Sequence, residues 1–320
     1  MKKRNIIFAS LIGVAVLVFV LSIVLFSKGS DTYKLTTIKQ AYNVLSLVDE
    51  KDEIVIPIYS NNKKCDFVDK KKVANCSITD TLEDNVFKLS LTDITSSGNV
   101  LKISGEEFYE YEYHFTFLGE YTEEVRSLID KAYLKIELKE KEVRLCIGSL
   151  SYYKVLNYGD GINNLDLVCL KAIVNELDEE KTIVGVVMGL KNNSYDGLTI
   201  SNINLLDVNL KASSGEIKII NEVPSSTDDI SALLGYEYKV SGVAIDNALD
   251  ISLDSYEVKY LLVPLKRVGD VYTNRFGLQI DYLINGKTMT YYLDDFLYFK
   301  ANQNLKLEDF EIFTYENNWG

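Results

Sequence analysis

Residues 278–293 read LQIDYLINGKTMTYYL, two alternating runs around the pair Asn285-Gly286. Asn-Gly is the preferred pair for a two-residue type I′ turn, because both positions need positive φ. Counting outward from the turn, Ile284 faces Lys287. Three further cross-strand pairs then fall on one face, and all three are apolar: Tyr282 with Met289, Ile280 with Tyr291, and Leu278 with Leu293. The sequence therefore predicts a β-hairpin with one buried face.

The same two-residue period occurs at Phe108–Leu118. One face would carry Tyr109, Tyr111, Tyr113, Phe115 and Phe117, and the other Glu110, Glu112, His114 and Thr116. With 22 Tyr and 13 Phe, the composition favours strands over helices. We expect a mainly β protein: an N-terminal transmembrane helix followed by two antiparallel β-sandwich domains of immunoglobulin-like type.

A second hairpin is predicted around Glu140-Lys141. This turn would pair Leu138 with Val143, Ile136 with Leu145 and Leu134 with Ile147. Upstream, Val86–Ile94 and Val100–Ile103 are predicted as two strands separated at Ser96–Asn99.

Three segments are predicted as helices in addition to the transmembrane helix. In Tyr33–Asp49, apolar residues recur at spacings of three and four, which indicates a short neck helix. Thr122 is a candidate cap for a helical turn through Ile129, and residues 225–235 have helix signals at both ends. The apolar residues that recur in the predicted neck helix are Leu35, Ile38, Tyr42, Leu45 and Val48.

Ile6–Phe26 contains no charged residue and, at about 1.5 Å per residue, would span roughly 31 Å, the thickness of a bilayer core. Leu25-Phe26-Ser27-Lys28 does not resemble a signal-peptidase site, so we predict an uncleaved anchor rather than a signal peptide. Lys2, Lys3 and Arg4 precede the span and favour a cytoplasmic N-terminus. The predicted protein is single-pass, with the chain from Ser30 onward outside the cell membrane.

The expected organisation follows from these segments. Residues 1–29 would form the cytoplasmic tip and transmembrane anchor, and residues 30–52 the short helical neck. Residues 53–156 would form the first β-sandwich domain and residues 157–320 the second, with a boundary at Tyr158–Gly161.

The formal net charge is −13. So acidic a surface repels phosphate backbones, and we therefore expect no nucleic-acid partner. It would suit cations or a basic partner, although an acidic surface also serves solubility alone. We expect a protein partner at the membrane or cell envelope.

Catalytic signatures are sparse. His114 is the only histidine, and its expected place on the Glu-bearing face of a strand disfavours a Ser-His-Asp triad, a Cys-His pair or a His-based zinc site. No P-loop or Rossmann glycine pattern occurs. An Asp-Gly repeat at Asp160 and Asp196 resembles dockerin calcium loops but lacks the preceding acidic ligands. We predict no catalytic residue, no cofactor and no metal site.

Four cysteines remain. Cys65 and Cys76 are eleven positions apart, and outside the membrane such a pair most simply closes a loop disulfide. Cys146 and Cys169 could form a second, less favoured bridge or remain buried thiols.

Residues 182–207 resemble part of the bacterial extracytoplasmic immunoglobulin-like domains of the FxLYD type. The shared pattern is a strand, a Lys-Asn-Asn-Ser turn and a second strand, and the sequence here is TIVGVVMGLKNNSYDGLTISNINLLD. The resemblance covers under a tenth of the chain. It implies a β-sandwich used for binding or scaffolding and transfers no catalytic residue.

The favoured function is therefore non-enzymatic: a membrane-anchored, extracytoplasmic binding or scaffold protein, such as the accessory subunit of a transporter-like membrane complex. A cell-surface adhesin or carbohydrate binder is the first alternative, and it predicts exposed aromatic clusters on a sheet face or loop end. A carboxylate-dependent hydrolase at the cell envelope is the second, and it predicts a pocket with two converging carboxyls of raised pKa.

Overall fold

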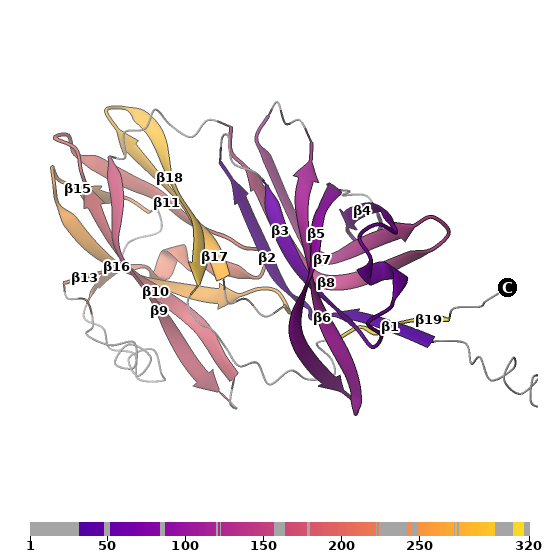
Figure 1. Cartoon of the computed structure of the whole chain (residues 1–320). Helices are drawn as coiled ribbons and strands as arrows, with labels where there is room; N and C mark the ends of the chain where they lie inside the picture. Colours follow the sequence, from indigo (N-terminus) through magenta and orange to yellow (C-terminus); the bar gives the residue numbers. More distant parts are fainter. Residues whose placement is uncertain are drawn as a thin grey trace, which may run out of the picture.

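The computed structural model describes the chain in segments: residues 32–47, 52–83, 87–119, 121, 123–156, 164–177, 180–221, 223, 242–244, 249–271, 273, 275–297 and 310–316. In these segments the protein is built from strands, with two single-turn 3-10 helices, Asp66–Val68 and Ser214–Glu216. The strands form three sheets in two bodies that lie side by side (Figure 1).

One nine-stranded sheet forms the first domain, with the order β19-β1-β3-β6-β5-β4-β7-β8-β2. It curls around its own core rather than packing against a second sheet (Figure 1). Its strands are β1 (Thr32–Thr37), β2 (Gln40–Ser46), β3 (Glu53–Ser60), β4 (Val73–Thr79), β5 (Phe87–Ile103), β6 (Glu106–Leu118), β7 (Val125–Leu138), β8 (Glu142–Lys154) and β19 (Phe313–Glu316).

Two sheets packed face to face form the second domain. The order of one is β14-β13-β16-β10-β9, with β12 also paired to β16, and that of the other is β15-β11-β17-β18. Side chains of both sheets share one core, in which Met188 and Val263 meet Ile200 and Leu278. Its strands are β9 (Leu165–Leu177), β10 (Glu180–Asn192), β11 (Leu198–Leu206), β12 (Leu210–Ala212), β13 (Lys218–Ile220), β14 (Gly242–Ala244), β15 (Ile251–Leu253), β16 (Val258–Arg267), β17 (Arg275–Ile284) and β18 (Lys287–Leu297).

The C-terminal strand belongs to the first domain. After β18 the chain returns, and β19 pairs antiparallel with β1, with Thr32 opposite Glu316 and Leu35 opposite Phe313. Figure 1 shows β1 and β19 together on the side of the first domain remote from β15. Phe310 packs on a satellite cluster formed with Tyr59, Ile103 and Phe108. The first domain therefore depends on residues from both ends of the chain.

The two domains meet at the edge strand β2, which contacts β17 and β18 of the second domain. Side-chain Nδ2 of Asn43 donates to Oδ2 of Asp207 at 2.8 Å, and Nδ2 of Asn209 donates to Oγ of Ser149 at 2.8 Å. An open sheet edge invites pairing with other chains, so this docking also protects β2.

The predicted neck helix is wrong, because residues 32–46 form the two strands β1 and β2. Tyr33 and Leu35 are buried in the first strand, and Tyr42 and Val44 in the second. These pairs have a two-residue period, and the change of strand at Ile38–Lys39 creates the misleading spacing of three and four.

Three other local predictions also fail. Residues 125–129, predicted as a helical turn, begin β7. The expected break at Ser96–Asn99 is a bulge within the continuous strand β5, and the chain turns at Ser104-Gly105 instead. The hairpin between β7 and β8 pairs Ile136 with Val143, a shift of two residues that keeps the same apolar face inward.

The Asn285-Gly286 hairpin is confirmed pair by pair, including Leu278 with Leu293. The strand at Phe108–Leu118 is also confirmed, and Tyr113, Phe115 and Phe117 lie in the core. Phe108, however, is buried on the opposite face of the sheet.

The described residues contain no helix long and apolar enough to cross a bilayer. The predicted anchor Ile6–Phe26 and the predicted helix at residues 225–235 lie outside the described residues.

Candidate functional site

Three turns meet at one end of the second domain: residues 193–197 after β10, 254–257 before β16, and Asn285-Gly286 between β17 and β18. The registers bring them together, because Leu198 lies opposite both Leu253 and Ile284. Nδ2 of Asn285 donates to Oδ2 of Asp196 at 2.8 Å, and Oγ of Ser255 donates to the carbonyl of Ser194 at 3.0 Å.

The side chain of Asn192 holds two of these turns, residues 193–197 and 254–257, in place. Its side chain is fully buried, and Nδ2 donates to the carbonyls of Asp196 at 2.8 Å and Asp254 at 2.9 Å, with a longer contact to Leu253 at 3.3 Å. Its Oδ1 accepts hydrogen bonds from the Ser194 amide and hydroxyl. Every polar atom of this buried amide is thus used to hold the turns in one conformation.

Two tyrosines lie on this rigid base, and we call the pair with its three turns the tyrosine tip. Tyr195 is 86% exposed and Tyr256 is 48% exposed. Their ring centroids are 5.2 Å apart at an interplanar angle of 85°, an edge-to-face contact. Tyr256 has a φ of 59°, which is rare for a bulky residue and concentrates at functional sites.

Carboxylates surround the tyrosine tip. A backbone N–H donated by Asp254 lowers the pKa of Glu257, and the neighbouring Lys259 ammonium, 3.2 Å from it, acts in the same direction. The hydrogen bond with Tyr195 raises the pKa of the Tyr256 hydroxyl. The tip therefore offers two aromatic rings together with acidic and amide groups, a combination suited to binding rather than to bond cleavage.

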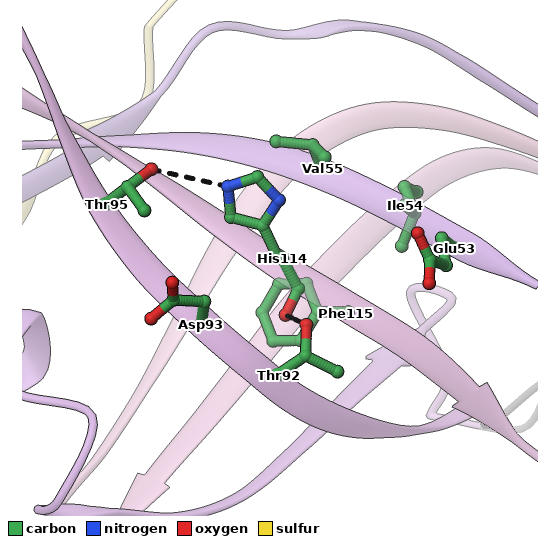
Figure 2. Close-up of a pocket in the computed structure, with 8 residues that line it drawn as sticks. All are labelled: Glu53, Ile54, Val55, Thr92, Asp93, Thr95, His114 and Phe115. Atoms are coloured by element: carbon green, nitrogen blue, oxygen red, sulfur yellow. Dashed lines mark hydrogen bonds between the residues drawn. The ribbon is translucent and has the colours of Figure 1, made fainter.

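His114 lies in a shallow pocket of about 240 Å³ on the outer side of β3, β5 and β6 (Figure 2). Nε2 of His114 is 3.3 Å from Oγ1 of Thr95 and 3.8 Å from Oε2 of Glu112. Figure 2 shows Asp93 and Glu53 on opposite sides of the imidazole. No group of three or more His, Cys, Asp or Glu side chains able to hold a metal occurs among the described residues. The hydroxyl at hydrogen-bond distance from the imidazole is that of Thr95, and this contact lies on the exposed face of the sheet.

The four cysteines are free thiols in the structure. Cys65 and Cys76 are buried in the core of the first domain together with Tyr113, and burial raises the pKa of the Tyr113 phenol. The disulfide between them stays a prediction. Cys146 is buried, Cys169 is half-buried in the other domain, and their pairing likewise stays a prediction.

The hydrolase alternative requires two converging carboxyls of raised pKa. Burial raises the pKa of Asp207, although hydrogen bonds from Asn43 and other donors act against it. The donors around this carboxylate are Asn43, the amides of Asn209 and Leu210, and the hydroxyl of Thr273. Asp207 is thus occupied in joining the domains.

The sequence predicts a Lys-Asn-Asn-Ser turn within residues 182–207 but not the roles of Asn192, Tyr195 and Tyr256. A signal existed, because each tyrosine stands among turn-forming residues, in Asn-Ser-Tyr-Asp-Gly and Asp-Ser-Tyr-Glu. An aromatic residue within a turn has no local core to pack against.

No protein-family model matches the sequence, and no curated protein resembles it. Among solved structures, the C-terminal domain of the Streptococcus agalactiae AgI/II polypeptide BspA is 9% identical with a TM-score of 0.21, over 80% of this chain and 96% of that one. The collagen adhesin of S. aureus is 11% identical with a TM-score of 0.21, over 88% and 99%. A protein of unknown function from Porphyromonas gingivalis W83 is 10% identical with a TM-score of 0.24, over 81% and 98%. Such scores do not establish a shared fold.

Proposed function

We propose that this chain is a non-enzymatic, extracytoplasmic binding protein of adhesin type that contacts its ligand through the tyrosine tip. The supporting observation is the exposure of Tyr195 and Tyr256 on turns fixed by a buried amide. In this reading, the predicted anchor Ile6–Phe26 holds the two β-domains outside the membrane, and the second is an immunoglobulin-like sandwich.

Physical reasoning supports binding over a purely structural role for the pair. An exposed tyrosine leaves apolar surface in water, and a tyrosine at positive φ adds backbone strain of order 1–3 kcal/mol. Neither feature improves the stability of the second domain. Both become useful when a ligand covers the rings, because rigid aromatic side chains lose little conformational entropy on binding.

The test uses the full-length chain in detergent micelles, probed against panels of neutral glycans, acidic glycans and extracellular-matrix proteins. For any ligand bound by the wild type, Tyr195→Ala and Tyr256→Ala should each weaken affinity about tenfold or more, as truncating an aromatic hot spot does. Leu82→Ala is the matched control, since Leu82 is 75% exposed in the first domain. Unchanged affinity in both tyrosine variants would exclude the tip as the binding surface.

A second experiment distinguishes the adhesin function from that of an accessory subunit of a membrane complex. Purification of the full-length protein from its own membranes in mild detergent, with crosslinking and mass spectrometry, should recover it without a stoichiometric multi-span partner. Recovery of such a partner, crosslinked outside the tyrosine tip, would favour the accessory subunit over the adhesin.

A further inference from the structure

A groove of about 420 Å³ lies between the two domains, apart from the tyrosine tip. One wall comes from the start of β7 in the first domain, with Arg126, Leu128 and Asp130. The other comes from β11, β12 and the residue after β16 in the second domain, with Lys211 and Val268. The groove therefore exists only while the domains are docked.

Two cations line the groove, Arg126 from the first domain and Lys211 from the second. The Arg126 guanidinium lies over the ring of Tyr153, with 5.4 Å between its central carbon and the ring centroid. Neither Arg126 nor Lys211 forms an ion pair with a carboxylate of the described part of the chain, although Asp130 lines the same groove.

The strand register places further positive charge beside Lys211. Lys211 of β12 lies directly opposite Lys266 of β16, and Arg267 follows at the next pair. Like charges directly opposite each other destabilise a sheet. Lys266 reaches Glu216 at 3.3 Å, but both side chains are about 60% exposed, so this pair offsets little of the repulsion.

Two carboxylates, Asp130 and Asp207, also line the groove. Asp207 lines the groove, but its carboxylate accepts hydrogen bonds from Asn43 and from the amides of Asn209 and Leu210. Leu128 and Val268 remain partly exposed at the walls, 42% and 53%. The groove thus combines apolar surface with Lys211 and with Arg126, which contacts Tyr153.

We propose that this interdomain groove binds an oxyanion, that is a sulfate, phosphate or carboxylate group, carried on a ligand whose body packs on Leu128 and Val268. Arg126 supplies a planar guanidinium suited to two oxygens at once, and Lys211 supplies a point charge from the opposite wall. Because the two cations belong to different domains, the bound anion also holds the domains together.

The experiment measures affinity of the full-length protein in detergent for dextran sulfate, with unmodified dextran and inorganic sulfate as separate arms. Arg126→Gln and Lys211→Gln should each weaken dextran sulfate binding about fivefold, the effect of one charge-assisted contact. Lys102→Gln is the control, because Lys102 is 72% exposed and lies in the β5–β6 hairpin of the first domain. Wild-type binding should weaken as sodium chloride rises.

Thermal stability gives a second readout. Inorganic sulfate should raise the midpoint of wild-type unfolding more than that of the Arg126→Gln, Lys211→Gln double variant at equal ionic strength, because only the wild type has the site. Binding of inorganic sulfate alone would identify a free-anion site, whereas binding of dextran sulfate alone would identify a polymer ligand. Equal affinity for unmodified dextran, or unchanged affinity in both single variants, would overturn the proposal. Tyr195→Ala should leave this binding intact, which separates it from the proposed function of the tyrosine tip.

Discussion

Asn43 and Asp207 join the two domains by a hydrogen bond of 2.8 Å between the amide Nδ2 and the carboxylate Oδ2. The two residues are 164 positions apart, and Asp207 is almost fully buried. The same Asn43 amide donates to the carbonyl of Arg275 at 2.6 Å. Domain docking is therefore held in part by hydrogen bonds from one amide of the first domain to a nearly buried carboxylate and a carbonyl of the second.

The buried Asp207 predicts a pH dependence of stability. Burial raises the folded-state pKa of its carboxyl above the ordinary 3.8, so the folded protein binds this proton more strongly than the unfolded chain does. The stabilisation of the folded state by the protonated Asp207 carboxyl is therefore fully present below the pKa of the unfolded chain. It is lost as pH rises through the folded-state pKa. Denaturant unfolding of wild type and Asp207→Asn should give a stability difference, wild type minus variant, that falls with rising pH. A difference that rises with pH would contradict this.

Removing the buried amide of Asn192 should loosen the tyrosine tip. Asn192→Ala leaves several turn carbonyls without donors, and we expect a loss of about 1–3 kcal/mol in the free energy of unfolding. Asn192→Asp, which keeps the shape but places a carboxylate against those carbonyls, should cost at least as much. Denaturant unfolding measures both, with Asn99→Ala in the exposed part of β5 as the control. Equal stability of all three variants would show that the turns hold without the amide.

Phe310 and Phe313 should matter to the first domain although they lie near the end of the chain. Each packs on buried residues of the first sheet. Truncating either to alanine should lower the free energy of unfolding by about 1–3 kcal/mol, since both are partly buried. Ile312 between them is 40% exposed, so Ile312→Ala should be nearly neutral. A larger effect from Ile312→Ala than from the two phenylalanine variants would mean that the strand docks in another register.

Gly148 in β8 is at a position that no other residue fits. Its φ is +107°, and a Cβ there would lie 2.3 Å from the Gln40 carbonyl oxygen of β2. Gly148→Ala should therefore cost more than about 3 kcal/mol, because it combines strain with a backbone clash. Gly98→Ala is the matched control, since Gly98 also has positive φ, +79°, but faces open space. Thermal unfolding of the two variants should show the larger loss at Gly148.

The cysteines should differ in reactivity. Burial raises the pKa of Cys76 to about 12 and also raises that of Cys65 and Cys146, so few thiolates form at these positions. Pulse alkylation of the reduced native protein should label the half-buried Cys169 first. Mass spectrometry of the same protein without prior reduction tests the Cys65–Cys76 bridge, which would appear as a cross-linked peptide pair. Rapid labelling of Cys76 in the native state would contradict its burial.

The amino-acid sequence by itself determined the strands whose signals are local. The Asn285-Gly286 turn sets its register because only φ-permissive residues close a two-residue hairpin, and each later pair follows from that turn. The alternation from Tyr113 to Phe117 likewise fixes which face is buried. Composition also restricts any histidine-dependent chemistry to His114, the single histidine.

Only the tertiary structure determined the features that depend on contacts between residues far apart in the sequence. Residues 32–46 became strands because β1 finds partners in β3 and β19, and β2 finds one in β8, and no local period encodes such pairing. The tyrosine tip exists because Asn192 bonds to turns some sixty residues apart in sequence. The oxyanion groove requires Arg126 and Lys211 from two domains. Sequence fixes short-range backbone preference, whereas burial and charge environment arise only when remote strands close around a common core.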